Sequence, residues 1–197
     1  DVDYLLIGHL SEDRTPEGTL LGGTVCYSGL TANALGHRVG LVTAASTELD
    51  LRPLEALSIV VRDSAHSTSF ENTYTAAGRV QKVHSMADPL EPSDIPEQWK
   101  GVELIHAAPL VHEISIEVLK EFPDSFIGLT PQGLMREWDS GGRISARSWE
   151  AVSKAIQIAD AVVVSAADLR MDYSAAEAMA ARCRIMVLTR SEEHTSE

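Results

Sequence analysis

The sequence has little of what several large classes of protein require. It holds 2 cysteines in 197 residues, Cys26 and Cys183, so we expect reduced thiols rather than a disulfide framework. Its 16 Lys and Arg residues stand against 29 Asp and Glu residues, which gives a formal net charge of −13. Because nucleic-acid binding needs clustered cations, we expect no nucleic-acid partner. No run approaches the ~18 apolar residues of a membrane span, so we expect no membrane partner and a cytoplasmic location.

Several motifs of phosphate and metal chemistry are also missing. The sequence contains no Walker-type Gly-x-x-x-x-Gly-Lys-Ser/Thr. The first expected strand is not followed by the Gly-x-Gly-x-x-Gly turn of nicotinamide-binding folds, which argues against a dehydrogenase. His106 and His112 are too loosely spaced for a pair of metal ligands on one helix.

What the sequence does contain is a regular alternation of short apolar runs and helix-like segments. This alternation predicts an α/β fold around a mostly parallel sheet. The expected strands cover residues 4–8, 39–43, 103–106, 126–129, 161–165 and 185–189. The expected helices cover residues 23–35, 114–122, 148–159 and 174–182. The strands are apolar throughout, so we expect them to be buried on both faces.

Two segments break this alternation, residues 13–21 and residues 58–86. Both are polar and β-prone, and residues 67–75 alternate small polar with aromatic side chains. Half-exposed antiparallel strands have this pattern. We therefore expect the two segments to leave the main layer and to form a small β lid.

The most informative stretch combines a carboxylate with a pair of glycines. Asp13 lies five residues after Gly8, beyond the end of the first expected strand, and Gly22-Gly23 opens a helix of small residues. Ligands of open α/β sheets bind beyond the carboxyl ends of the strands. Glycines at a helix start let backbone N–H groups approach bound oxygens. We interpret the set as a binding site for substrate hydroxyls; a tight turn and a solvated Asp are the structural alternatives.

The order of these residues resembles the ribokinase-like (PfkB) carbohydrate kinases. The resemblance rests on Gly8, Asp13, Gly22-Gly23 and Leu35-Gly36, followed by the second strand. It implies a three-layer sandwich with a β lid, and ATP-dependent phosphorylation of a hydroxyl on a sugar, cyclitol or nucleoside. The residues that it implies for substrate binding are Asp13, Gly22, Gly23, Tyr27 and Asn72. Tyr27 is a departure, because many relatives have an Asn at that position.

The resemblance also implies a region for phosphate and metal. Ser165-Ala-Ala-Asp168 occupies the place of the family's Asn-x-x-Glu motif, which organises Mg²⁺ and phosphate through water. Ser165 is shorter than the family's Asn, and Asp168 is shorter than its Glu. We therefore expect this region to organise the metal more weakly or indirectly, with no direct metal ligand. Arg136 follows a loop that often lies near phosphate, and it either faces a phosphate or lies on the surface.

The end of the sequence departs from the family. The family's catalytic Gly-Ala-Gly-Asp does not occur. Residues 190–197 resemble the translation of a sequencing adapter, with a natural polar tail as the alternative. We therefore expect residues 1–189 to be an inactive part of a kinase domain that is incomplete at its C-terminus. A homodimer formed through the lid is a further expectation, and the rival function is a non-catalytic binding module for a sugar or nucleoside.

Overall fold

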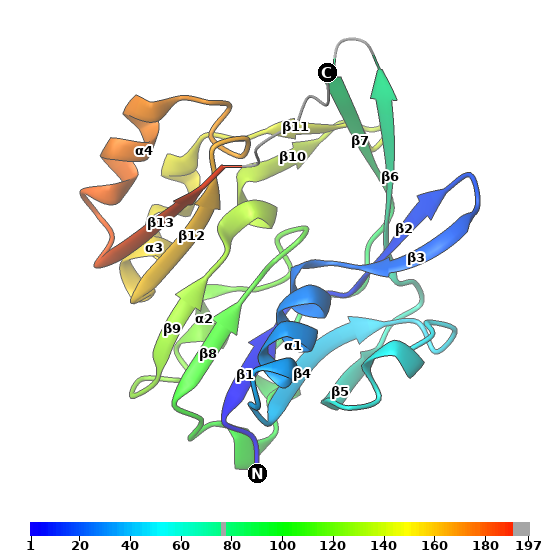
Figure 1. Cartoon of the computed structure of the whole chain (residues 1–197), viewed down its shortest axis with the longest axis vertical. Coiled ribbons are helices and arrows are strands. Elements are labelled where there is room, and N and C mark those ends of the chain that lie inside the picture. Colours follow the sequence, from blue (N-terminus) through cyan, green and yellow to red (C-terminus); the bar gives the residue numbers. More distant parts are fainter. Residues whose placement is uncertain (76–77, 191–197) are drawn as a thin grey trace.

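The computed structural model describes residues 1–75 and 78–190. Residues 76–77 of the expected lid and residues 191–197 of the expected tail lie outside the described residues. A seven-stranded sheet forms the centre, and all of its strand pairs are parallel (Figure 1). Its order is β13 (Ile185–Thr189), β12 (Ala161–Ser165), β9 (Phe126–Leu129), β8 (Leu104–Ala107), β1 (Tyr4–Ile7), β4 (Val39–Ala45) and β5 (Ser58–Asp63).

The helices lie on both faces of this sheet. The α-helices are α1 (Thr24–Ala34), α2 (Ile116–Leu119), α3 (Ser153–Ile158) and α4 (Tyr173–Ala180). Short 3₁₀ helices are η1 (Arg52–Leu54), η2 (Pro92–Asp94), η3 (Glu97–Trp99), η4 (Pro131–Met135) and η5 (Trp149–Val152). One core packs α1 against the strands around β1, and a larger core packs α2, α3 and α4 against the opposite face. The expected three-layer α/β sandwich is confirmed.

A second sheet forms the lid. Its order is β3 (Gly18–Gly22), β2 (Ser11–Thr15), β6 (Thr68–Thr75) and β7 (Gly78–Ser85). Figure 1 shows these strands projecting beyond the carboxyl ends of β1 and β4. A hairpin of β10 (Arg136–Trp138) and β11 (Ile144–Ala146) reaches the lid, where the Val83 N–H donates to the Gly142 carbonyl at 2.8 Å.

The expected boundary of the lid is wrong in one place. Residues 58–63 were expected in the lid, but they form β5, which pairs in parallel with β4 from Gly40↔Ser58 to Ala45↔Asp63. The strand is half-exposed because it is the edge of the central sheet, and its apolar residues 59–61 are flanked by polar ones. An edge strand of a parallel sheet and a lid strand therefore have the same sequence pattern.

The expectation that every central strand is buried on both faces is also wrong. The strand β4 is buried throughout, whereas Phe126 is 39% exposed, and Ile185 and Val187 on β13 are each 45% exposed. Their register places these side chains on the face that carries α1, and α1 covers only the other half of that face. Two expected helices are shorter than predicted, because 114–122 is helical only at 116–119, and 148–159 divides into η5 and α3. Among the described residues, no helix is long and apolar enough to cross a membrane.

Candidate functional site

The paired glycines form a corner between the lid and α1. The strand β3 ends at Gly22, and Gly23 is the N-cap of α1 with φ 95° and ψ 150°. A side chain is strained at this φ, so the corner requires glycine at position 23. No side chain caps the helix. The Cys26 N–H donates to the Gly23 carbonyl at 3.1 Å. The earlier N–H groups of Thr24 and Val25 have no carbonyl four residues before them in the helix, so this end can receive ligand oxygens.

Asp13 lies directly over this corner. It is half-buried on β2, and a Cβ built on Gly22 would lie 2.6 Å from Asp13 Oδ2 and 2.9 Å from Ser11 Oγ. Any side chain at position 22 would therefore displace the carboxylate. The Ser11 hydroxyl donates to Asp13 Oδ1 at 3.1 Å. Burial, and to a smaller degree the charge of Asp13, raises the pKa of the Cys26 thiol one turn into α1. Cys26 is buried and free, as expected.

Gly23 is enclosed by two loops that follow β1 and β8. A Cβ at Gly23 would lie 3.0 Å from the His9 carbonyl oxygen, 3.2 Å from Leu110 Cδ1 and 3.3 Å from the Ser11 nitrogen. These distances are too short for an ordinary side-chain contact. The position of this corner is therefore fixed by the backbone around His9 and by Leu110.

One face of the lid looks toward the same region. The register pairs Asp13 with Phe70, Phe70 with Val83, and Asn72 with Gln81, so these side chains share a face of the pleated sheet. Phe70 and Val83 are buried against Leu110 and Val111. Asn72 and Gln81 are half-buried, and the Gln81 amide donates to Asn72 Oδ1 at 3.0 Å. The lid therefore presents a carboxylate, an apolar floor and an amide pair on one side.

Arg136 is not a surface residue. It is 8% exposed, its guanidinium lies 5.5 Å from the centre of the Phe70 ring, and its Nη1 donates to the Leu110 carbonyl at 3.3 Å. It lines a cavity of about 230 Å³ together with Gln81 of the lid, Gln132 and Asp168. The alternative of a solvated arginine is therefore wrong, and Arg136 shares a cavity with Asp168.

Ser165 and Asp168 form a closed motif at the end of β12. The Ser165 hydroxyl donates to Asp168 Oδ2 at 2.6 Å, and the Ser165 N–H donates to the same oxygen at 3.2 Å. The Gln132 amide donates to Asp168 Oδ1 at 2.9 Å. Both carboxylate oxygens therefore have protein donors. The described residues contain no group of three His, Cys, Asp or Glu side chains that could hold a metal ion.

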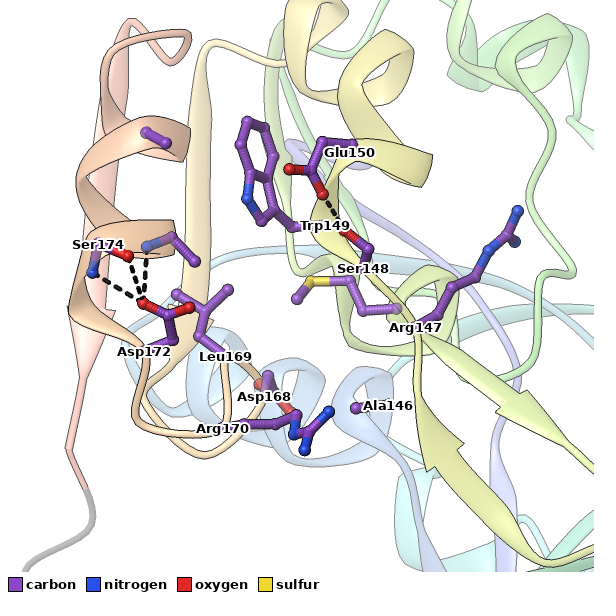
Figure 2. A pocket seen from close by; sticks show the side chains of 13 residues that line it. Ala146, Arg147, Ser148, Trp149, Glu150, Asp168, Leu169, Arg170, Asp172 and Ser174 are labelled. Carbon is purple, nitrogen blue, oxygen red and sulfur yellow. Dashed lines mark hydrogen bonds between the residues drawn. The ribbon is translucent and has the colours of Figure 1, made fainter.

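A larger cavity of about 420 Å³ lies on the other side of Asp168 (Figure 2). Arg170 and Met171 both adopt left-handed backbone angles, with φ 55° and 60°, in the turn after Asp168. Figure 2 shows the Arg170 side chain beside Asp168, whereas the Arg147 guanidinium points away from this turn. Asp172 caps α4 by accepting from the N–H groups of Ser174 and Ala175. The cavity therefore joins the Asp168 motif to the beginning of α4.

The structure thus gathers most of the predicted residues into two groups. Asp13, Gly22 and Gly23 meet at one corner, while Arg136 and Asp168 share a cavity with the lid residue Gln81. Tyr27 lies on the outer side of α1 with 62% of its surface exposed.

Sequence reasoning missed three polar residues of this region. They are Ser11, Gln81 and Gln132. The two-residue alternation of β2 could have indicated Ser11, because it lies two positions before Asp13.

Known proteins with this arrangement have the ribokinase-like fold. A pyrophosphate-dependent kinase in the ribokinase family, solved with a pyrophosphate analog and myo-inositol, has a TM-score of 0.78 at 23% identity. The alignment covers 95% of this chain and 73% of the chain of that kinase. A fructokinase from Xylella fastidiosa with bound ATP has a TM-score of 0.65 at 13% identity, covering 97% of this chain and 73% of its own. At these identities, the likeness establishes the fold.

The sequence comparison gives a relative as well. A cytidine kinase of Thermococcus kodakarensis is 28% identical over 131 residues, which are 60% of this chain and 47% of that protein. The chain therefore spans about half the length of the curated relative that it matches. No family model matches the chain.

Proposed function

We propose that this chain is the acceptor-binding part of a ribokinase-family (PfkB) kinase that phosphorylates a hydroxyl of a sugar, cyclitol or nucleoside. The observation that carries the proposal is the Asp13 carboxylate, held 2.6 Å from the position that a Gly22 Cβ would occupy. Solved relatives of the same fold bind myo-inositol in one case and ATP in another, and the distant relative is a cytidine kinase. These names support the class of acceptor and leave its identity open.

In this proposal Asp13 accepts hydrogen bonds from two hydroxyls of the acceptor. A carboxylate accepts such bonds strongly, and each contributes about 1.5–3 kcal/mol when water is excluded. The bare backbone of Gly22 and Gly23 lets the acceptor approach the start of α1. The lid face with Asn72 covers it, which excludes water from the transferred group.

The donor phosphates would bind between Arg136 and the Ser165–Asp168 motif. ATP with Mg²⁺ is the proposed donor. Because both Asp168 oxygens already accept protein hydrogen bonds, this carboxylate offers at most an anchor for water around the metal. Among the described residues, no group of three His, Cys, Asp or Glu side chains could bind Mg²⁺ directly.

Pyrophosphate is a second candidate for the donor. The pyrophosphate-dependent relative has a higher TM-score and a higher identity than the fructokinase with ATP. A parallel assay with the two donors decides between them.

The general base is a separate part of the proposal. The sequence contains no Gly-Ala-Gly-Asp, so we propose that a longer parent protein supplies the base and that residues 1–197 alone bind acceptor without transferring phosphate. A binding module without transfer chemistry is the rival. The two proposals predict different results for a longer clone, because a clone of a binding module would transfer no phosphate.

The lid is also the proposed surface for a homodimer. The strand β3 is an edge of the lid sheet, and Leu20 on it is 61% exposed. Exposed edge strands and apolar side chains favour pairing between chains. Light scattering of the wild type and of Leu20→Lys tests this, because the substitution should shift a dimer to monomer.

The test of the function uses a longer clone that includes downstream sequence. Transfer to myo-inositol, fructose and cytidine is measured with ATP and with pyrophosphate, for the wild type and for Asp13→Ala. The proposal expects one acceptor to be phosphorylated and expects Asp13→Ala to lose at least ~100-fold of kcat/KM, as the loss of two charge-assisted hydrogen bonds predicts. Activity of Asp13→Ala equal to the wild type, or no transfer to any acceptor, contradicts it.

A further inference from the structure

A buried carboxylate that the proposed mechanism does not use lies behind the acceptor corner. Glu113 is 3% exposed and follows β8. Its Oε1 accepts from the N–H groups of His9 and Leu110, both at 2.9 Å. Its Oε2 accepts from Leu110 at 2.9 Å and from Val111 at 2.8 Å. One side chain thus fills a concave group of backbone N–H donors from two different loops.

The two loops belong to neighbouring strands. The strands β1 and β8 pair in parallel, so their carboxyl ends lie side by side. His9 lies two residues after the end of β1, and Leu110 lies three residues after the end of β8. Glu113 therefore joins the loops by hydrogen bonds where the sheet itself no longer pairs them. Hydrogen bonds to an ionised acceptor are stronger than bonds between neutral groups.

The groups that Glu113 holds are those that enclose Gly23. The His9 carbonyl and Leu110 Cδ1 lie 3.0 and 3.2 Å from the position of a Gly23 Cβ. Glycine lacks this Cβ, so the distances show that both loops pack against the Gly23 backbone with no room for a side chain between them. The position of the Gly22–Gly23 corner under Asp13 therefore depends on the link that Glu113 makes.

The same link extends to the lid and to Arg136. The His9 ring bonds to Thr68 Oγ1 at 2.8 Å, at the beginning of β6, and to the Asp88 carbonyl at 3.0 Å. That carbonyl can only accept, so Nε2 carries the hydrogen. On the other loop, the Leu110 carbonyl accepts from Arg136. Glu113 thus lies at the junction of the acceptor corner, the base of the lid and the cavity of Arg136.

We propose that Glu113 is a positioning residue, whose carboxylate fixes the loops after β1 and β8 and thereby the Gly22–Gly23 corner and the Arg136 side of the acceptor site. The inference rests on the proposed function for the ligand, but its geometry concerns this chain alone. Glu113 contacts backbone groups, and its effect on the acceptor is transmitted through Gly23 and Leu110.

The test compares the wild type with Glu113→Ala, Glu113→Gln and the control Glu117→Gln. Glu117 lies four residues later on α2, and its side chain is 66% exposed. Hydrogen exchange by mass spectrometry is read for residues 7–13, 20–27 and 108–113. Titration calorimetry with myo-inositol and with cytidine gives Kd. Glu113→Gln keeps one acceptor oxygen but places an NH₂ group against a backbone N–H, so its effects should lie between those of the wild type and Glu113→Ala.

We expect Glu113→Ala to speed exchange at least ~10-fold in residues 20–27 as well as in 108–113, and to raise Kd at least ~10-fold, with Glu117→Gln unchanged. If residues 108–113 loosen while residues 20–27 and Kd stay as in the wild type, Glu113 is merely structural and the inference is overturned. If Glu113→Ala does not fold, Glu113→Gln decides by the same criteria. If the wild type binds neither acceptor, the proposed acceptors are wrong, and exchange in residues 20–27 alone decides the role of Glu113.

Discussion

Asp13 and Asp168 lie beyond the carboxyl ends of strands in opposite halves of one sheet, and their carboxylates have different partners. Asp13 accepts one hydrogen bond from Ser11 and faces the bare backbone of Gly22. Asp168 accepts from Ser165 through one oxygen and from Gln132 through the other. The first carboxylate has acceptor capacity left for a ligand, whereas the second is largely satisfied by its own chain. In the proposed function, the half around α1 would bind the acceptor directly, and the half around β12 would hold the donor phosphates through a preformed turn.

The two halves also differ in how their faces are covered. A row of paired residues crosses six of the seven strands, from Leu41 through Leu6, His106 and Gly128 to Ala161 and Ile185. Leu41 and Leu6 are fully buried beneath α1, whereas Ile185 is 45% exposed at the other end. An apolar face that is buried at one end and exposed at the other is typical of a surface that another element or chain covers.

The largest expected effect comes from Gly22→Ala. The new methyl group would displace Asp13 and Ser11. The φ of Gly22 lies outside the left-handed region, so the backbone itself accepts alanine. We expect acceptor affinity to fall at least ~100-fold, because the carboxylate loses its position for both hydroxyls, while the chain still folds. Calorimetry checks this, with Gly101→Ala as the control because a Cβ there meets nothing within 4 Å. Wild-type affinity in Gly22→Ala would remove the distinction between the two carboxylates.

His106 lies between the two halves of the sheet, and its burial makes the stability of the chain depend on pH. Burial lowers the pKa of His106 from 6.5 to about 4. As the pH falls, the His106 imidazole of the unfolded chain binds a proton near pH 6.5, whereas that of the folded chain does so only near pH 4. The contribution of His106 to the free energy of unfolding is therefore fully present above pH 6.5 and is lost as the pH falls toward 4. The difference of pKa corresponds to about 3 kcal/mol. Urea unfolding at pH 7.5 and pH 5 should show a smaller difference for His106→Gln, and an equal difference would contradict the prediction.

A matched pair of valines tests the coverage of the sheet. Val39 is 3% exposed beneath α1, and Val187 is 45% exposed on β13. Val39→Thr should cost about 1–3 kcal/mol by burying a hydroxyl. Val187→Thr should change the free energy of unfolding by less than ~0.5 kcal/mol. Thermal unfolding of both variants measures these costs, and equal costs would mean that both sites are covered in solution.

Asp168→Asn is expected to have a small effect on acceptor binding. The variant loses one of the acceptor oxygens in the motif, so the free energy of unfolding should fall by about 1 kcal/mol. Affinity for the acceptor should stay within ~2-fold, because the hydrogen bonds of Asp168 go to Ser165 and Gln132 rather than to the Asp13 corner. A loss as large as that of Gly22→Ala would show that the two corners act as one site.

Much of the central sheet could be predicted from the sequence, because buried parallel strands are short, apolar and separated by helices. The strands at 126–129, 161–165 and 185–189 have the predicted bounds. The edge strand β5 could not be told from a lid strand, since its short apolar run is half-exposed and flanked by polar residues. The exposed face of β13 was missed for a similar reason, because its residues are as apolar as those of a fully buried strand.

The acceptor corner was predictable in part. Asp13, Gly22 and Gly23 could be grouped because a helix start and a strand end have local signals in the sequence. Glu113 has no such signal, since its donors belong to His9 and to the loop of Leu110, and only the pairing of β1 with β8 brings these loops together. The burial of Arg136 likewise depends on Phe70 of the lid, which is distant in sequence.

The measurement that tests the central claim most directly is an NMR titration of the ¹⁵N-labelled chain with myo-inositol and with cytidine, repeated on Asp13→Ala. The account predicts that one ligand shifts the amide resonances of Gly22, Gly23 and Asp13 in the wild type. Asp13→Ala should abolish these shifts, while the rest of its spectrum remains that of a folded chain. Shifts that persist in Asp13→Ala, or that arise only at residues far from Gly22 and Gly23, would contradict it.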